Sequence, residues 1–130
     1  MTEDDRNRSD VDRFLQDKID TVPHLEALLL LWNSRPRSWS PEDMAGRLFL
    51  SGGAAIEILD DLVRKGLIVN SPDIPGSYRY ECEPRGDELL ASVDSIYRRE
   101  LIRVSRLIHA KPSAAVRAFA RAFRLKKDSD

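Results

Sequence analysis

The sequence predicts a mainly α-helical domain that carries one small β-hairpin. Apolar residues recur three or four positions apart over most of the 130 residues, which is typical of amphipathic helices. Hydroxyl side chains that suit helix N-caps precede several of these segments. Two short β-prone segments, 67–69 and 78–82, flank a turn-rich loop, as in a hairpin. A chain of this length forms one domain with a single core.

The N-terminal part is expected to contain two helices. Residues 1–9 are polar and are predicted to form a disordered tail. A first helix then follows a cap at Ser9 or Asp10, and a second helix follows a cap at Thr21. The second helix is apolar on most sides over residues 25–32, so we expect it at the centre of the core.

Two short helices come next, after a short strand at residues 38–40. Ser40 precedes proline and two acidic residues, which suit the first turn of a helix. Ser51 is the predicted cap of the following helix, and Gly66 occupies the position where a left-handed C-terminal residue is expected. The apolar positions of this second short helix are expected to share one buried face: Ile56, Leu59, Leu62 and Val63.

The C-terminal part is predicted to contain one long helix, over about residues 87–110, and a last helix that begins at Pro112. The long helix would span roughly 36 Å, which exceeds the body of a small domain. Its overhang would leave apolar side chains uncovered unless the last helix or a second subunit packs on them, and a two-fold dimer is the usual solution. The predicted dimerisation residues are Leu101, Val104 and Ile108.

The order of these elements resembles the winged helix-turn-helix of small bacterial transcriptional regulators. The resemblance covers about Thr21 to Cys82 and rests on the caps at Ser40 and Ser51, on the run DDLVRKGLIV and on the hairpin. It implies a winged-helix domain over residues 10–82. Residues 83–125 then form a helical dimerisation extension, and residues 126–130 form a polar tail.

The resemblance also implies a mode of DNA binding. The helix over residues 51–65 would enter the major groove, and residues 70–77 would form a wing on the backbone or minor groove. Phosphates would be contacted by basic and hydroxyl side chains, which bring most of the affinity. The predicted DNA-binding residues are Arg47, Ser51, Arg64, Lys65 and Arg79.

The charge of the predicted recognition helix leaves two interpretations open. Its outward positions include Glu57, Asp60 and Asp61, and its first turn lacks long polar side chains that read bases. The helix therefore reads double-stranded DNA weakly, or it presents an acidic, solvated face that holds a protein partner. If the acids pair internally with arginines, DNA binding stays open.

A basic segment lies at the C-terminus. Residues 97–130 carry a net charge of +7, whereas residues 1–66 and 67–96 carry −4 each. The predicted basic patch consists of Arg117, Arg121 and Arg124. It would be the solvated face of a docked helix, a patch for nucleic acid or an acidic protein, or a membrane-surface helix.

No pattern in the sequence indicates catalysis. His24 and His109 are far apart and lack partners at metal-ligand spacing, so we expect surface or capping roles, no metal site and no cofactor. Cys82 is the single cysteine and suits a reducing cytoplasm. The polar N-terminus is not expected to be a signal peptide, and no apolar run is long enough for an integral membrane segment.

Overall fold

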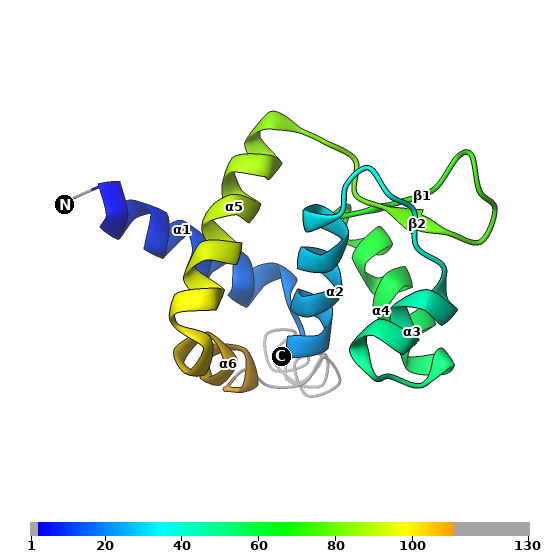
Figure 1. Cartoon of the computed structure of the whole chain (residues 1–130). Coiled ribbons are helices and arrows are strands. Elements are labelled where there is room, and N and C mark those ends of the chain that lie inside the picture. The colour runs from blue at the N-terminus through cyan, green and yellow to red at the C-terminus, as the bar shows by residue number, and fades with distance from the viewer. Residues whose placement is uncertain (1–2, 111–130) are drawn as a thin grey trace, which may run out of the picture.

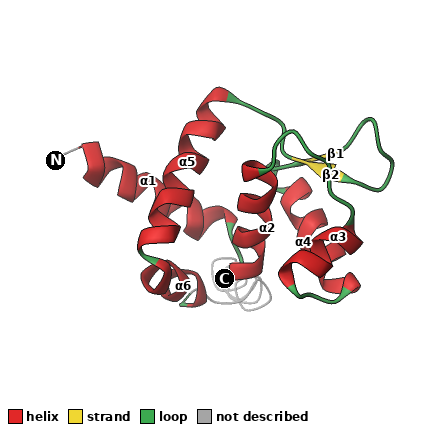
Figure 2. Cartoon of the chain, in the orientation of Figure 1, coloured by secondary structure: helices red, strands yellow, loops and turns green. Residues whose placement is uncertain are grey.

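A computed structural model describes residues 3–110 and confirms a mainly helical chain with one antiparallel hairpin (Figure 2). The elements follow one another in this order: α1 (Glu3–Lys18), α2 (Val22–Asn33), α3 (Pro41–Leu48), α4 (Gly52–Arg64), β1 (Val69–Asn70), β2 (Tyr78–Arg79), α5 (Pro84–Arg99) and α6 (Leu101–His109). This is the winged-helix arrangement, in which α3 and α4 form the helix-turn-helix and the hairpin forms the wing.

The predicted N-caps of α2, α3 and α4 are confirmed. Thr21, Ser40 and Ser51 each accept the backbone N–H of the residue three positions later, at 3.4, 3.1 and 3.1 Å respectively. Such a bond satisfies one of the N–H groups that the first turn of a helix leaves without a partner. The sequence therefore determines where these three helices begin.

Helix α2 lies in the middle of the molecule, between α1, α5 and α6 on one side and α3 and α4 on the other (Figure 1). Leu25, Leu28 and Leu31 of this helix are fully buried. A helix with neighbours on several sides needs apolar residues around most of its circumference, as the sequence predicts for residues 25–32. The predicted place of this helix in the core is confirmed.

The wing begins directly after α4. Gly66 has a φ of 74°, and the N–H groups of Gly66 and Leu67 bond back to the carbonyls of Val63 and Leu62, at 2.9 and 3.0 Å. This pair of bonds is a Schellman motif, and it keeps Leu67 in the helix terminus. The strand predicted from residue 67 therefore starts only at Val69, which pairs with Arg79.

The short strand predicted at residues 38–40 is present as a single bridge. Trp39 donates its N–H to the Tyr78 carbonyl at 2.7 Å and accepts from the Tyr78 N–H at 2.8 Å. Trp39, Tyr78 and Tyr80 are all buried, which places these aromatic rings in the core. The bridge ties the segment before α3 to the wing, so that the wing and the helix-turn-helix form one unit.

The first helix differs from its prediction. It begins at Glu3, well before the expected caps at Ser9 and Asp10, so residues 3–9 are helical where a disordered tail is expected. The reason is tertiary contact, because α1 packs against α5 and α6. Arg8 on its polar face forms an ion pair with Glu100. Tertiary contacts of this kind stabilise a polar helical segment that would not be stable alone.

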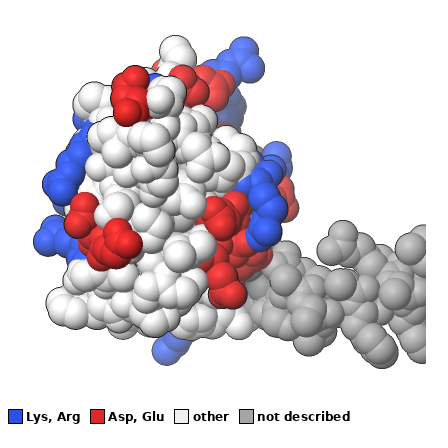
Figure 3. All heavy atoms as spheres, turned by 90° about the vertical axis from the view of Figure 1, so that its right-hand side faces the viewer, with Lys and Arg blue, Asp and Glu red and all other residues white. Residues whose placement is uncertain are grey.

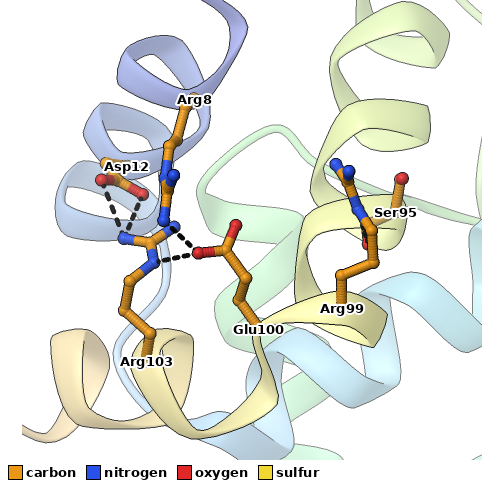
Figure 4. A network of polar contacts seen from close by, with 6 residues as sticks. All are labelled: Arg8, Asp12, Ser95, Arg99, Glu100 and Arg103. Atoms are coloured by element: carbon orange, nitrogen blue, oxygen red, sulfur yellow. Dashed lines mark hydrogen bonds and ion pairs between the residues drawn. The ribbon is translucent and has the colours of Figure 1, made fainter. Parts of the chain in front are cut away.

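The prediction of one long helix over residues 87–110 is wrong. The helix is interrupted at Glu100, which has the non-helical angles φ −128° and ψ 46°. Glu100 accepts from Arg103 Nε at 2.8 Å, and Arg103 also donates to Asp12 of α1 at 3.1 and 3.2 Å (Figure 4). The carboxylate of Asp12 is the main cause that raises the pKa of Arg103. Ion pairs from Arg8 and Asp12 of α1 thus lie around the break between α5 and α6.

The break removes the overhang on which the predicted dimer contact rests. Val104 and Ile108 are fully buried within a single chain, and α6 packs on α1, α2 and α5. Of the predicted dimerisation residues only Leu101 is exposed, to 52%, and its neighbour Ile102 is exposed to 67%. Burial of Val104 and Ile108 is therefore explained by the fold of one chain.

The turn between α3 and α4 contains a residue that is poorly suited to its backbone. Phe49 has φ 57° and ψ 46°, and its side chain is 95% exposed. The left-handed region costs an ordinary L-residue roughly 1–2 kcal/mol, and asparagine tolerates it better. We predict that Phe49→Asn raises the free energy of unfolding by about 0.5–1 kcal/mol, measured by urea denaturation. Phe49→Ala is the control, since it removes the ring but keeps the cost, and equal stabilisation by alanine would contradict the explanation.

Candidate nucleic-acid interface

Helix α4 is amphipathic and presents one long face to solvent. Its buried positions are Ala55, Ile58, Leu59 and Leu62, which pack toward α2 and α3. The prediction that Ile56 belongs to this buried face is wrong, because Ile56 is 46% exposed. The buried face is centred between Ile58 and Leu59, and Ile56 lies to one side of it.

The first turn of α4 is small and open. Ser51, Gly52 and Gly53 are exposed, and a Cβ placed on either glycine would meet no other atom within 4 Å. The Ser51 hydroxyl caps the Ala54 N–H, while side chains of other elements do not shield the N–H groups of the two glycines. The helix dipole gives these groups a partial positive charge. Such a terminus suits an anionic oxygen, while it offers no side chain that hydrogen-bonds to base edges.

Two of the three acidic residues of α4 are engaged within the chain. Asp60 accepts a hydrogen bond from the Tyr78 hydroxyl at 2.7 Å. This bond, together with burial, raises the pKa of Tyr78 to about 12. Asp61 contacts His24 Nε2 at 2.9 Å and forms an ion pair with Arg64. Glu57 is exposed, and it is the remaining carboxylate on the outer face of α4.

The predicted DNA-binding residues lie in three places. Arg47 is exposed at the end of α3, close in sequence to Ser51 at the start of α4, while Arg79 lies at the root of the wing, 3.8 Å from Asp73. Arg64 and Lys65 lie at the other end of α4, roughly 20 Å from Ser51 along the helix. Arg79 itself pairs in register with Val69, which follows the C-terminal end of α4. The structure does not bring the three places together.

Lys65 has an internal role that the sequence does not reveal. Its Nζ donates to the Asp20 carboxylate at 2.8 Å and to the Lys18 carbonyl at 2.8 Å. Lys65 therefore fastens the C-terminus of α4 to the end of α1. A contact with phosphate would require its release from both acceptors.

Two further arginines that lie before α3 are held by tryptophan rings. The guanidinium of Arg35 stacks on Trp32 at 4.4 Å, and that of Arg37 stacks on Trp39 at 4.1 Å. These cation–π contacts orient the guanidinium groups while they keep their charge.

The face that carries α3, α4 and the wing is not basic. Figure 3 shows a broad uncharged area with acidic groups to both sides of it, whereas lysine and arginine lie mainly at its edges. The electrostatic part of any DNA affinity on this face is therefore small. The predicted basic patch of Arg117, Arg121 and Arg124 lies outside the described residues.

The fold is shared with solved transcription regulators. MepR, a transcription regulator of the Staphylococcus aureus multidrug efflux pump MepA, has 19% identity over 96% of this chain and 90% of its own, with a TM-score of 0.52. The MarR family protein Rv2887 of Mycobacterium tuberculosis has 20% identity over 97% of this chain and 87% of its own, also with a TM-score of 0.52.

A third structure, Rv1404 from Mycobacterium tuberculosis, has 20% identity over 92% of this chain and 83% of its own, with a TM-score of 0.52. No protein-family model and no curated protein sequence matches the chain. The similarity therefore establishes the winged-helix fold of such regulators for nearly the whole chain. Separately, none of the helices within residues 3–110 is long and apolar enough to cross a membrane.

The bond from Tyr78 to Asp60 connects the wing to α4 and has a measurable pH dependence. The pKa of Tyr78 is raised from 10.0 to about 12. The stabilisation that this hydrogen bond gives to the folded chain is therefore complete below pH 10 and is lost as the pH rises through about 12. We predict that Tyr78→Phe lowers the free energy of unfolding by about 1–2 kcal/mol at pH 7. The difference from the wild type should shrink between pH 10 and pH 12, as followed by urea denaturation.

Asp60→Asn is the matched control for that measurement, since it keeps an acceptor for the hydroxyl and removes the charge. It should lose part of the stabilisation and most of the pH dependence. A deficit of Tyr78→Phe that is the same at pH 8 and pH 12 would contradict the assignment.

Proposed function

We propose that this chain is a DNA-binding transcription regulator of the bacterial winged-helix type, which acts as a cytoplasmic homodimer. The observation that carries the proposal is the joined helix-turn-helix and wing, in a fold shared over nearly the whole chain with MepR and Rv2887. The α3–α4 unit is supported on α2, and α4 keeps one face clear for a groove.

The mode of binding follows from the surface of α4. Its open first turn approaches the phosphate backbone with N–H groups and the Ser51 hydroxyl. Arg47 at the end of α3 lies close in sequence to that turn, and Arg79 lies on the wing, so the two arginines would supply two cationic contacts. Asp61 opposes DNA less than the sequence suggests, since Arg64 forms an ion pair with it. Asp60 keeps its charge, because its partner Tyr78 is a neutral hydroxyl.

The small number of available cations sets the expected strength. Each phosphate neutralised by the protein contributes roughly 0.9 to the slope of log affinity against log salt. With two or three such contacts per chain, a dimer would show a slope of about −4 to −5. This is a shallow dependence, and sequence recognition would rest largely on shape and close approach of the backbone.

The first test is fluorescence anisotropy with labelled genomic duplexes at several salt concentrations. We predict that Arg47→Glu combined with Arg79→Glu lowers the affinity at least about tenfold and makes the salt slope shallower. Arg98→Glu is the control, because Arg98 is exposed on α5 and pairs with Asp94 of the same helix. Full affinity in the double variant would show that this face does not bind DNA.

Absence of binding by the wild type, even at low salt, would overturn the DNA-binding proposal. The same fold would then serve as a protein-interaction module, which uses the outer face of α4 or the basic C-terminal segment. A pull-down with the full chain, compared with a Glu57→Lys variant, distinguishes the first of these surfaces, because Glu57 is exposed on α4, whereas Asp60 and Asp61 contact Tyr78, His24 and Arg64.

The proposed dimer has its own test at the start of α6. Leu101 and Ile102 are exposed next to each other, and a contiguous exposed apolar surface is typical of a contact site. We predict that Leu101→Glu with Ile102→Glu shifts the protein from dimer to monomer in analytical ultracentrifugation without loss of helicity. Ile74→Glu is the control, since Ile74 is 52% exposed on the wing. A dimer that persists in the double variant would place the contact elsewhere.

A further inference from the structure

Three side chains that are far apart in the sequence meet behind the recognition helix. Asp20 comes from the turn between α1 and α2, His24 from the first turn of α2, and Asp61 from α4. Each offers one ligand atom, and these three atoms all lie within 4.8 Å of one another. His24 is buried, while the two carboxylates are half-buried, so the group can be reached from solvent on its carboxylate side.

We propose that Asp20, His24 and Asp61 form a binding site for a divalent transition-metal cation such as Zn²⁺. One imidazole and two carboxylates are a donor set that suits zinc and its first-row neighbours, while magnesium and calcium prefer oxygen ligands alone. Three protein ligands leave one coordination position for water or a further donor. The ligand atoms are close enough that small side-chain movements would bring them onto one ion.

The histidine is already oriented for this role. His24 Nε2 faces Asp61, and His24 Nδ1 lies 2.6 Å from the Thr21 hydroxyl oxygen. A metal ion on Nε2 fixes the proton on Nδ1, and that N–H would then donate to Thr21. Histidine ligands in metal sites usually have such a partner on their second nitrogen. Thr21 also receives the His24 backbone N–H, which holds the two residues in register.

Two basic side chains already contact these carboxylates and would compete with a metal ion for them. Lys65 Nζ lies 2.8 Å from Asp20, and Arg64 forms an ion pair with Asp61. A metal ion and these two cations would share the same oxygens, so metal binding displaces Lys65 and Arg64. This step rests on the proposed function: the two released side chains at the end of α4 become available to phosphates, and the metal ion raises the affinity of the chain for DNA.

The test measures metal binding by the full chain without DNA, using Zn²⁺ in competition with a chromogenic chelator. We expect one Zn²⁺ per chain. Asp20→Asn, Asp61→Asn and His24→Gln should each weaken binding at least about tenfold, since even the loss of an outer partner weakens a metal site by this factor. Lys65→Met should strengthen it, because a competing cation is removed, and a purely structural ion pair predicts no such gain.

The chain offers matched controls for unrelated metal binding. His109 is the other histidine and is exposed, and Cys82 is exposed as well. His109→Gln and Cys82→Ser should bind Zn²⁺ as the wild type does. Loss of binding in either control, or unchanged binding in all three ligand variants, would overturn the proposed site.

A second readout needs no variant of a buried residue. The chain has two histidines, so its imidazole NMR spectrum contains two sets of signals, which His109→Gln assigns. Titration with Zn²⁺ should shift the His24 set before the His109 set. Movement of the His109 set alone, or of neither set, would contradict the proposal even if His24→Gln fails to fold.

The link to DNA is measured separately, by anisotropy with and without Zn²⁺. Zn²⁺ should raise the affinity of the wild type and should have no effect on the Asp61→Asn variant. DNA binding without any Zn²⁺ binding would leave the proposed function standing and overturn the metal site. Zn²⁺ binding at His24 without DNA binding would support the site and overturn the proposed function.

Discussion

The burial of α2 is the constraint on which the rest of the structure depends. This helix packs against α3 and α4 on one side and against α5 and α6 on the other, so it joins the helix-turn-helix to the helical extension. Its apolar surface on most sides requires neighbours on most sides. The orientation of α4 is therefore set by α2, and a disturbance at the N-terminal turn of α2, where His24 contacts Asp61, is felt directly by α4.

The charges of α4 serve its attachment as much as its outer surface. Asp60 binds the wing through Tyr78, Asp61 binds α2 through His24, and Lys65 binds the end of α1. Each contact joins α4 to a different element, so the helix is held at several points along its length. The consequence for DNA is twofold, because Arg64 offsets the charge of Asp61, while Lys65 is held by Asp20 and does not attract phosphates. Contacts within the chain therefore hold α4 in place, while its surface offers few positive charges for DNA.

Local signals in the sequence were sufficient for much of the fold. Caps at Thr21, Ser40 and Ser51 and the left-handed Gly66 depend on chemistry within a few residues, and all four are present. The break at Glu100 depends instead on Arg8 and Asp12, which lie some ninety positions away. Apolar periodicity does not reveal such a break, since one non-helical residue shifts the pattern only slightly. The early start of α1 has the same origin, because its polar residues are helical through contact with α5 and α6.

The candidate site shows the same division between local and distant information. The exposed face of α4 and its open first turn follow from the positions of apolar and small residues in one helix. His24 pairs with Asp61, and Lys65 pairs with Asp20 and the Lys18 carbonyl, across 37 to 47 positions, and no spacing rule connects these residues. Metal-ligand patterns in sequences usually depend on ligands that are close together on one helix or turn. A site assembled from three elements is visible only when the chain is folded, and here it coincides with the basic residues that the winged-helix resemblance assigns to DNA. The carboxylates of Asp20 and Asp61 therefore have two partners to choose between, a metal ion or the side chains of Lys65 and Arg64. Only when a metal ion takes these carboxylates are Lys65 and Arg64 released to contact a phosphate.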